Sequence, residues 1–185
     1  SPGNIMYPKS EPYKLCTFSR VMKEKGIEDA INAVRSVNAH FGRTVYTLDI
    51  FGQVDAGYEE RFSELKKSFP SYIEANKSVE ILKSYFALLF PTYYKGEGFA
   101  GTLIDAMSAG VPVIASDWKY NSEFVVPGKT GVIIENCSAE RLAEELINIA
   151  AAPEKWNSMR LSSLQESEKY KPDIAARPLI DRING

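Results

Sequence analysis

The chain has 185 residues, of which 44% are hydrophobic and 25% are charged, fractions typical of globular domains, which excludes disordered and collagen-like classes. Lysine and arginine total 22 against 24 acidic residues, giving a net charge of −2. Because binding to duplex nucleic acid needs clustered positive charge, this balance predicts no nucleic-acid partner.

Strand-like and helix-like segments alternate along the chain, as judged from apolar periodicity and short apolar runs. Strands are expected at residues 13–18, 44–51, 71–74, 86–90, 112–116 and 132–134, and helices at 27–41, 58–69, 79–85, 101–109, near 122, at 139–151 and around 156–164. This alternation predicts right-handed crossovers, a parallel sheet and a Rossmann-like three-layer α/β sandwich. We expect one domain over residues 1–170, followed by a tail at residues 171–185.

Ligands of such sheets bind outside the carboxyl ends of the strands. Three loops follow predicted strands and contain charged or glycine residues, at residues 19–26, 91–101 and 117–122. The chemistry of the protein is therefore expected in these loops.

The second loop contains a glycine pattern that has two interpretations. Gly96, Gly98 and Gly101 satisfy G-x-G-x-x-G, and Asp117 lies about 20 residues further on, which together match a nicotinamide-dinucleotide fingerprint. Residues 91–95 separate the strand from the first glycine, however, and the motif does not lie in the first strand-helix-strand unit. Under either interpretation, a helix that begins beside glycines presents free N–H groups and a positive dipole end to a phosphate.

Several short motifs occur in order over about residues 13–150. They are Arg20, Lys25 and Gly26, Glu-Gly-Phe at residues 97–99, Asp105, Gly-Val-Pro-Val-Ile-Ala at residues 110–115, and Glu123 with Val126, Gly128, Thr130 and Gly131. This ordered set resembles the donor site of the GT-B retaining glycosyltransferases of family 4, also called glycosyl transferases group 1. The resemblance covers only the C-terminal, nucleotide-sugar-binding domain of such enzymes.

The resemblance implies catalytic roles for Arg20, Lys25 and Glu97. Arg20 and Lys25 would contact the diphosphate and offset the charge that grows as it departs, which makes a bound metal unnecessary. The sequence contains no Asp-x-Asp metal motif, so no metal site is predicted. Glu97 would accept hydrogen bonds from hydroxyls of the donor sugar.

The remaining donor-binding residues implied by the resemblance are Gly98, Phe99, Ala100, Gly101, Thr102 and Asp105. Asp105 stands where the family usually has glutamate and would bind the ribose hydroxyls, directly or through water. The nucleobase is held in relatives by the segment that corresponds to residues 71–77, where Ile73 and Glu74 are weak candidates for base contacts. Both UDP- and GDP-sugars therefore stay open, and no cofactor is expected beyond this co-substrate.

Aromatic and amide side chains near the loops are further candidates. Tyr93, Tyr94 and Trp118 could line the sugar pocket or pack on the sheet, and Asn121 is a candidate donor to the sugar. These assignments stay open at the level of sequence.

The resemblance implies transfer of a sugar to a glycan or lipid-linked acceptor in the biosynthesis of bacterial surface polysaccharide, such as capsule or lipopolysaccharide. The N-terminal acceptor domain is absent from this chain, so we expect it to be the missing partner and the chain alone to be inactive. The other hypotheses are an NAD-binding module and a non-catalytic interaction domain with a degenerate donor site.

The expected location is cytoplasmic, at or near the inner face of the plasma membrane. Cys16 and Cys137 lie in apolar contexts, which predicts reduced thiols. Residues 1–14 lack a secretion signal, and the apolar runs at residues 85–91 and 111–115 fall short of the roughly 18 residues that span a bilayer. Any membrane association of the full-length enzyme is therefore expected to be peripheral.

Overall fold

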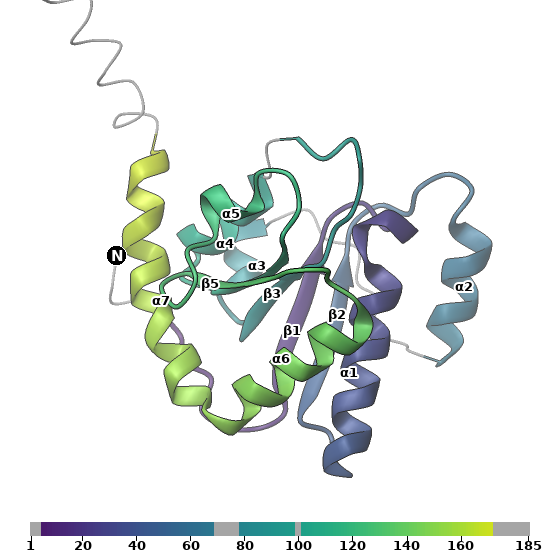
Figure 1. Ribbon diagram of the computed structural model, residues 1–185, viewed down its shortest axis with the longest axis horizontal. Helices are drawn as coiled ribbons and strands as arrows, with labels where there is room; N and C mark the ends of the chain where they lie inside the picture. The colour runs from purple at the N-terminus through teal and green to yellow at the C-terminus, as the bar shows by residue number, and fades with distance from the viewer. Residues whose placement is uncertain (1–4, 69–77, 99–100, 172–185) are drawn as a thin grey trace, which may run out of the picture.

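Five parallel strands form one sheet in the computed structural model, which describes residues 5–68, 78–98 and 101–171 (Figure 1). The strands are β1 (Tyr13–Phe18), β2 (Tyr46–Phe51), β3 (Ala87–Phe90), β4 (Val113–Ser116) and β5 (Gly131–Ile134). Their order across the sheet is β2-β1-β3-β4-β5, and every neighbouring pair is parallel. The predicted α/β sandwich with a parallel sheet is confirmed.

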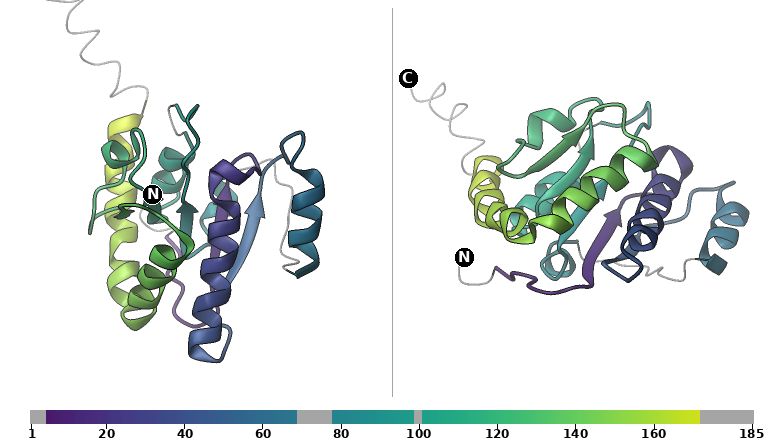
Figure 2. Two further views of the ribbon diagram at one scale, coloured as in Figure 1. Left: turned by 45° about the vertical axis from the view of Figure 1, so that its right-hand side comes forward. Right: turned by 60° about the horizontal axis from the view of Figure 1, so that its bottom comes forward.

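Helices cover both faces of this sheet. The helices are α1 (Ile27–Phe41), α2 (Glu59–Ser68), α3 (Ser78–Leu82), α4 (Gly101–Ser108), α5 (Asn121–Phe124), α6 (Ala139–Ala151) and α7 (Pro153–Ser167), with short 3-10 turns at Lys23–Lys25 and Glu168–Tyr170. One buried cluster joins α1, α2 and α6 to the face of β1 that carries Leu15, and a second joins α3, α4 and α5 to the face that carries Cys16. Figure 2 shows α7 on the β5 side of the sheet and α2 beyond β2.

The turn between α1 and β2 is fixed by a side chain of the helix. Asn38 Oδ1 accepts hydrogen bonds from the backbone N–H groups of Val45 and Tyr46 at 2.9 and 3.0 Å. Residues 44 and 45 therefore belong to the turn, and β2 begins at Tyr46 rather than at the predicted Thr44.

The C-terminal helix is longer than expected, because Pro153 occupies its first turn, where proline is well tolerated. The predicted strand at residues 71–74 and the tail from residue 172 lie outside the described residues. Within the described ranges, no helix has the length and hydropathy needed to cross a bilayer.

Helix α7 is tied to the start of β3 by buried hydrogen bonds. Trp156 Nε1 donates to the Phe86 carbonyl at 3.0 Å. The Arg160 guanidinium, fully buried, donates to the carbonyls of Tyr85 at 3.0 Å and Lys83 at 3.2 Å. Burial lowers the pKa of Arg160 to about 10. The arginine thus serves as a backbone clamp that joins the last long helix to the middle of the sheet.

The strand order places a change of direction in the chain connections between β1 and β3. The chain leaves β1 through α1 toward β2, and it leaves β3 through α4 toward β4, on the other side. Neighbouring strands whose connections diverge in this way form the topological switch point where α/β sheets bind ligands. The loops after β1 and β3 therefore border the expected site.

Candidate functional site

The loops after β1 and β3 touch each other directly. The backbone N–H of Tyr93 donates to the Glu24 carbonyl at 2.8 Å. Gly26 has a φ of +74°, and a Cβ at this position would lie 2.2 Å from the Pro91 carbonyl oxygen. Only glycine satisfies both the left-handed backbone and this close approach, so Gly26 sets the spacing between the two loops.

Lys25 and Glu97 form an ion pair across these loops, although they are separated by 72 positions in the sequence. Lys25 Nζ lies 2.6 Å from Glu97 Oε2 and 2.8 Å from Oε1. Only 10% of the Lys25 side chain and 9% of the Glu97 side chain are exposed. Thr92 Oγ1 donates to Glu97 Oε2 at 2.7 Å. The carboxylate is thus held by a cation and a hydroxyl in a nearly water-free setting, where charge-charge interactions are stronger than in solvent.

Tyr94 connects this pair to its surroundings. Its ring lies under Lys25 Nζ, 5.0 Å from the ring centre, and 6.0 Å from the Arg20 guanidinium carbon. Its carbonyl accepts a hydrogen bond from Trp118 Nε1 at 2.8 Å, and a Cβ on Gly96 would meet its ring at 2.7 Å. Tyr94 and Trp118 therefore shape the loop that holds Glu97, a role that sequence analysis leaves undecided.

Arg20 lies at the rim of the site. Its Nη1 forms an ion pair with Asp55 Oδ1 at 3.1 Å, and 55% of its side chain is exposed. Asp55 follows β2, so a third carboxyl-end loop contributes to the site. Sequence analysis misses Asp55 and Thr92, for which the available signal is their position just after a strand.

The start of α4 follows the loop after β3. Gly101 and Thr102 open the helix, and Asp105 lies one turn further on, half-buried. Among the described residues, a Cβ on Gly98 or Gly101 would meet no atom within 4 Å. Phe99 and Ala100 lie outside the described residues. Because β3 ends at Phe90 and α4 begins at Gly101, the connection is not the tight turn of a nicotinamide fingerprint.

Asn121, a candidate donor to the sugar, has its amide committed inside the protein instead. Asn121 is 2% exposed, and its Nδ2 donates to the Ser116 carbonyl at 3.0 Å. Ser116 Oγ in turn donates to the Thr92 carbonyl at 2.5 Å. Asn121 therefore supports the Thr92 loop from below, as expected of a buried amide that must find its partners within the fold.

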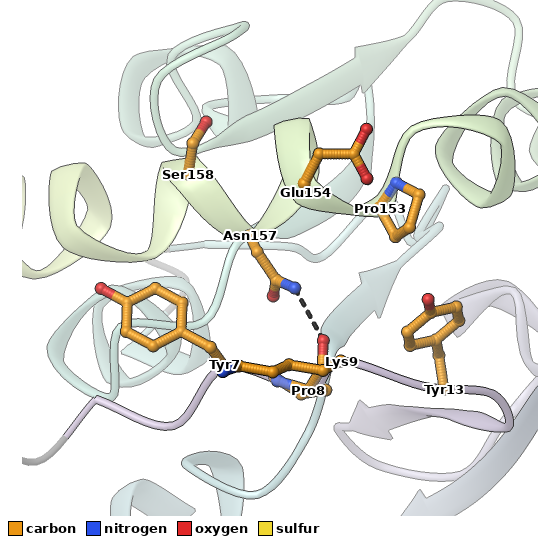
Figure 3. Close-up of a pocket in the computed structure, with 8 residues that line it drawn as sticks. All are labelled: Tyr7, Pro8, Lys9, Tyr13, Pro153, Glu154, Asn157 and Ser158. Carbon is orange, nitrogen blue, oxygen red and sulfur yellow. Dashed lines mark hydrogen bonds between the residues drawn. The ribbon is translucent and has the colours of Figure 1, made fainter.

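A hollow of about 490 Å³ lies at the opposite end of the sheet (Figure 3). Its walls come from the segment before β1 and the start of α7, where Asn157 Nδ2 donates to the Pro8 carbonyl at 2.7 Å. It contains none of the predicted site residues. Across the described part of the chain, no group of three or more His, Cys, Asp or Glu side chains is arranged to hold a metal ion.

Comparison with known sequences identifies relatives over nearly the whole chain. The profile of the family described as "Glycosyl transferases group 1" matches residues 7–163. The chain is 29% identical to the GtfA subunit of a UDP-N-acetylglucosamine–peptide N-acetylglucosaminyltransferase from Streptococcus gordonii, over 99% of this chain and 36% of that protein. It is 26% identical to the poly(glycerol-phosphate) alpha-glucosyltransferase of Bacillus subtilis, over 90% of this chain and 25% of that protein. The chain thus spans about a quarter to a third of the length of these relatives.

Solved structures show the same fold. The pneumococcal O-GlcNAc transferase GtfA, in complex with UDP and GlcNAc, superposes with a TM-score of 0.78 at 22% identity, over 94% of this chain and 36% of that one. The C-terminal domain of a glycosyl transferase group 1 family protein from Francisella tularensis gives a TM-score of 0.70 at 19% identity, over 86% of this chain and 87% of that one. The fold is the Rossmann-like domain of GT-B glycosyltransferases. Since the family profile covers most of its length, this chain belongs to the glycosyl transferases group 1 family.

Proposed function

We propose that the chain is the donor-binding domain of a retaining, metal-independent glycosyltransferase that uses a nucleotide sugar. The Lys25–Glu97 contact carries this proposal, because it places a cation suited to a diphosphate within 2.6 Å of a carboxylate suited to sugar hydroxyls. Both groups lie at the switch point of the sheet, where ligands of such folds bind.

The departing diphosphate gains negative charge as the sugar leaves. Lys25 and Arg20 are cations of the loop after β1, and the first N–H groups of α4 would add further donors. Preorganised groups of this kind each lower a barrier by about 3 to 4 kcal/mol. In this proposal they do the work that a bound metal does in other glycosyltransferases.

In this proposal, two acidic residues bind different parts of the donor. Glu97 binds sugar hydroxyls beside the backbone of Gly98, and Asp105 binds the ribose. UDP-sugars are the first donors to test, because the structure of the pneumococcal relative holds UDP; GDP-sugars are the second.

The acceptor is proposed to be a glycan or a lipid-linked glycan of the bacterial cell surface. One relative is a poly(glycerol-phosphate) alpha-glucosyltransferase, and a structural neighbour with a TM-score of 0.72 and 20% identity is a glycosyltransferase involved in lipopolysaccharide biosynthesis. A facing N-terminal domain would bind this acceptor, at the cytoplasmic side of the membrane.

Calorimetric titration of the 185-residue chain tests ligand class and metal dependence together. UDP-glucose, GDP-mannose, ADP-glucose and NAD would each be titrated with and without EDTA. We expect one nucleotide-sugar class to bind in both conditions and NAD not to bind. Arg20→Ala and Lys25→Ala should each weaken the binding by about 1.5 to 3 kcal/mol, the range for hydrogen bonds to charged groups.

Arg141→Ala is the matched control, since it removes an exposed cation on α6 that pairs locally with Glu144. It should leave the affinity unchanged. Binding that EDTA abolishes, preferential NAD binding, or full affinity in both site variants would each contradict the proposal.

A further inference from the structure

We infer that the Lys25–Glu97 pair makes the site select a nucleotide sugar over the free nucleoside diphosphate. This inference rests on the proposed function. It concerns which of two related ligands the site prefers, and it assigns that preference to an ion pair formed by the protein itself.

Both groups assigned to the donor bind each other in the structure. The ammonium of Lys25 contacts both carboxylate oxygens of Glu97, and Thr92 Oγ1 also donates a hydrogen bond to Oε2. The Tyr94 ring packs beside Lys25. With 10% and 9% of the two side chains exposed, water has little access to replace either partner.

In this inference, a free diphosphate binds Lys25 by taking it away from Glu97. The carboxylate would then keep only the Thr92 hydroxyl in a nearly buried position. Removing one partner of such a pair is costly, because the other charge stays desolvated and uncompensated. The gain from the new phosphate contact is offset by this loss.

A nucleotide sugar avoids the loss because it replaces both partners at once. Its diphosphate takes the ammonium, and its sugar hydroxyls donate to the carboxylate. After the sugar has been transferred, the remaining diphosphate offers Glu97 no hydroxyl, so Lys25 returns to Glu97. The pair thus favours donor binding and product release with the same contact.

Glu97→Gln tests this exchange, because the amide keeps the shape of the side chain and gives Lys25 no negative partner. We expect the variant to bind UDP about tenfold more tightly than the wild type, equivalent to one charge-assisted hydrogen bond no longer broken. The same variant should bind UDP-glucose more weakly than the wild type. GDP and GDP-mannose replace this pair of probes if the wild type prefers guanine.

Glu144→Gln is the control for net charge, since it removes one negative charge from an exposed pair on α6. The inference would be overturned by an equal gain in UDP affinity in this control, or by an unchanged or weaker UDP affinity in Glu97→Gln. In either case, a wild type that binds a nucleotide sugar would still uphold the proposed function. A wild type that binds no nucleotide sugar would overturn both.

A crystal structure of the wild type with the nucleotide sugar supplies a test that needs no variant. The distance from Lys25 Nζ to the Glu97 carboxylate should exceed the ion-pair limit of about 4 Å, with Lys25 on a phosphate oxygen and Glu97 on a sugar hydroxyl. A pair that stays closed in this complex would refute the exchange.

Discussion

Gly26 is the residue on which the contact between the two site loops depends. Its backbone is left-handed and its missing side chain lets the Pro91 carbonyl approach. Gly42, at the end of α1, has a similar φ of +63°, but a Cβ there would meet no atom within 4 Å. The two glycines therefore separate the effect of backbone strain from that of steric contact.

We expect Gly42→Ala to lower the free energy of unfolding by about 1 to 2 kcal/mol, from the left-handed backbone alone. Gly26→Ala should lower it by about 3 kcal/mol or more, since overpacking typically adds 1 to 3 kcal/mol. Urea denaturation followed by circular dichroism measures both values. Equal losses would show that the loop contact at Pro91 is unimportant.

The sequence identifies Lys25 and Glu97 as candidate site residues, but it does not indicate that they contact each other. Both residues stand in motifs with fixed spacing, so they could be named in advance, although for different parts of the donor. Their contact depends on β1 and β3 being neighbours, which no local pattern reveals. Thr92, Tyr94 and Asp55 act through the same long-range geometry, and each is an ordinary loop residue when taken alone.

At the scale of elements, α7 depends on its arginine clamp. Arg160→Met would leave the buried carbonyl of Tyr85 and the partly buried carbonyl of Lys83 without this donor. Because each unsatisfied buried group costs about 1 to 3 kcal/mol, we expect a loss of about 3 kcal/mol or more in the free energy of unfolding. Lys155→Met, at an exposed position of the same helix, should change it by less than about 0.5 kcal/mol. Urea denaturation of both variants distinguishes a clamp from a dispensable side chain.

A second link, between α7 and the turn before β5, depends on pH. The hydrogen bond from Lys129 Nζ at 2.7 Å, and then that from Lys169, lower the pKa of Glu166 below its ordinary value of 4.5. A carboxyl group whose folded pKa is depressed stabilises the fold above its unfolded pKa, and that contribution is lost as the pH falls through the folded pKa.

We therefore expect Glu166→Gln to cost up to about 1 kcal/mol at neutral pH, because both lysines are largely exposed. The difference between variant and wild type should shrink steadily below about pH 4.5, the ordinary value for this carboxyl. Denaturant titrations over a series of pH values measure it. A difference that does not change with pH would mean that the ion pairs contribute nothing.

Elements with a strong apolar period could be predicted almost to the residue. The helix at residues 27–41 is found where expected, because its buried face repeats at helical spacing. The start of β2 could not be predicted, because it is set by the Asn38 side chain reaching across the turn. The alternation of elements predicts a parallel sheet, but not that β3 inserts beside β1 rather than beside β2.

At the scale of the whole molecule, the chain should fold and bind its donor without transferring the sugar. It resembles most of a separately solved C-terminal domain, which supports independent folding. Transfer also needs an aligned acceptor, and the orientation effect that is missing without a facing domain can reach about 7 to 11 kcal/mol. Donor and candidate acceptor glycans, incubated with the purified chain, should give no product above the level of slow donor hydrolysis. Turnover at an ordinary enzymatic rate would contradict the proposal that this chain binds the donor and that a facing domain is needed for transfer.

The clamp between α7 and the start of β3 also joins segments that are 70 to 75 positions apart and are therefore made at different times. Synthesis proceeds from the N-terminus, so Tyr85 and Phe86 leave the ribosome long before Trp156 and Arg160 are available to bind their carbonyls. Until then the carbonyls just before β3 lack their permanent donors, in a nascent chain that already contains both halves of the donor site. A pause in translation between the end of β5 at Ile134 and Arg160 would therefore leave all five strands made but the clamp unformed.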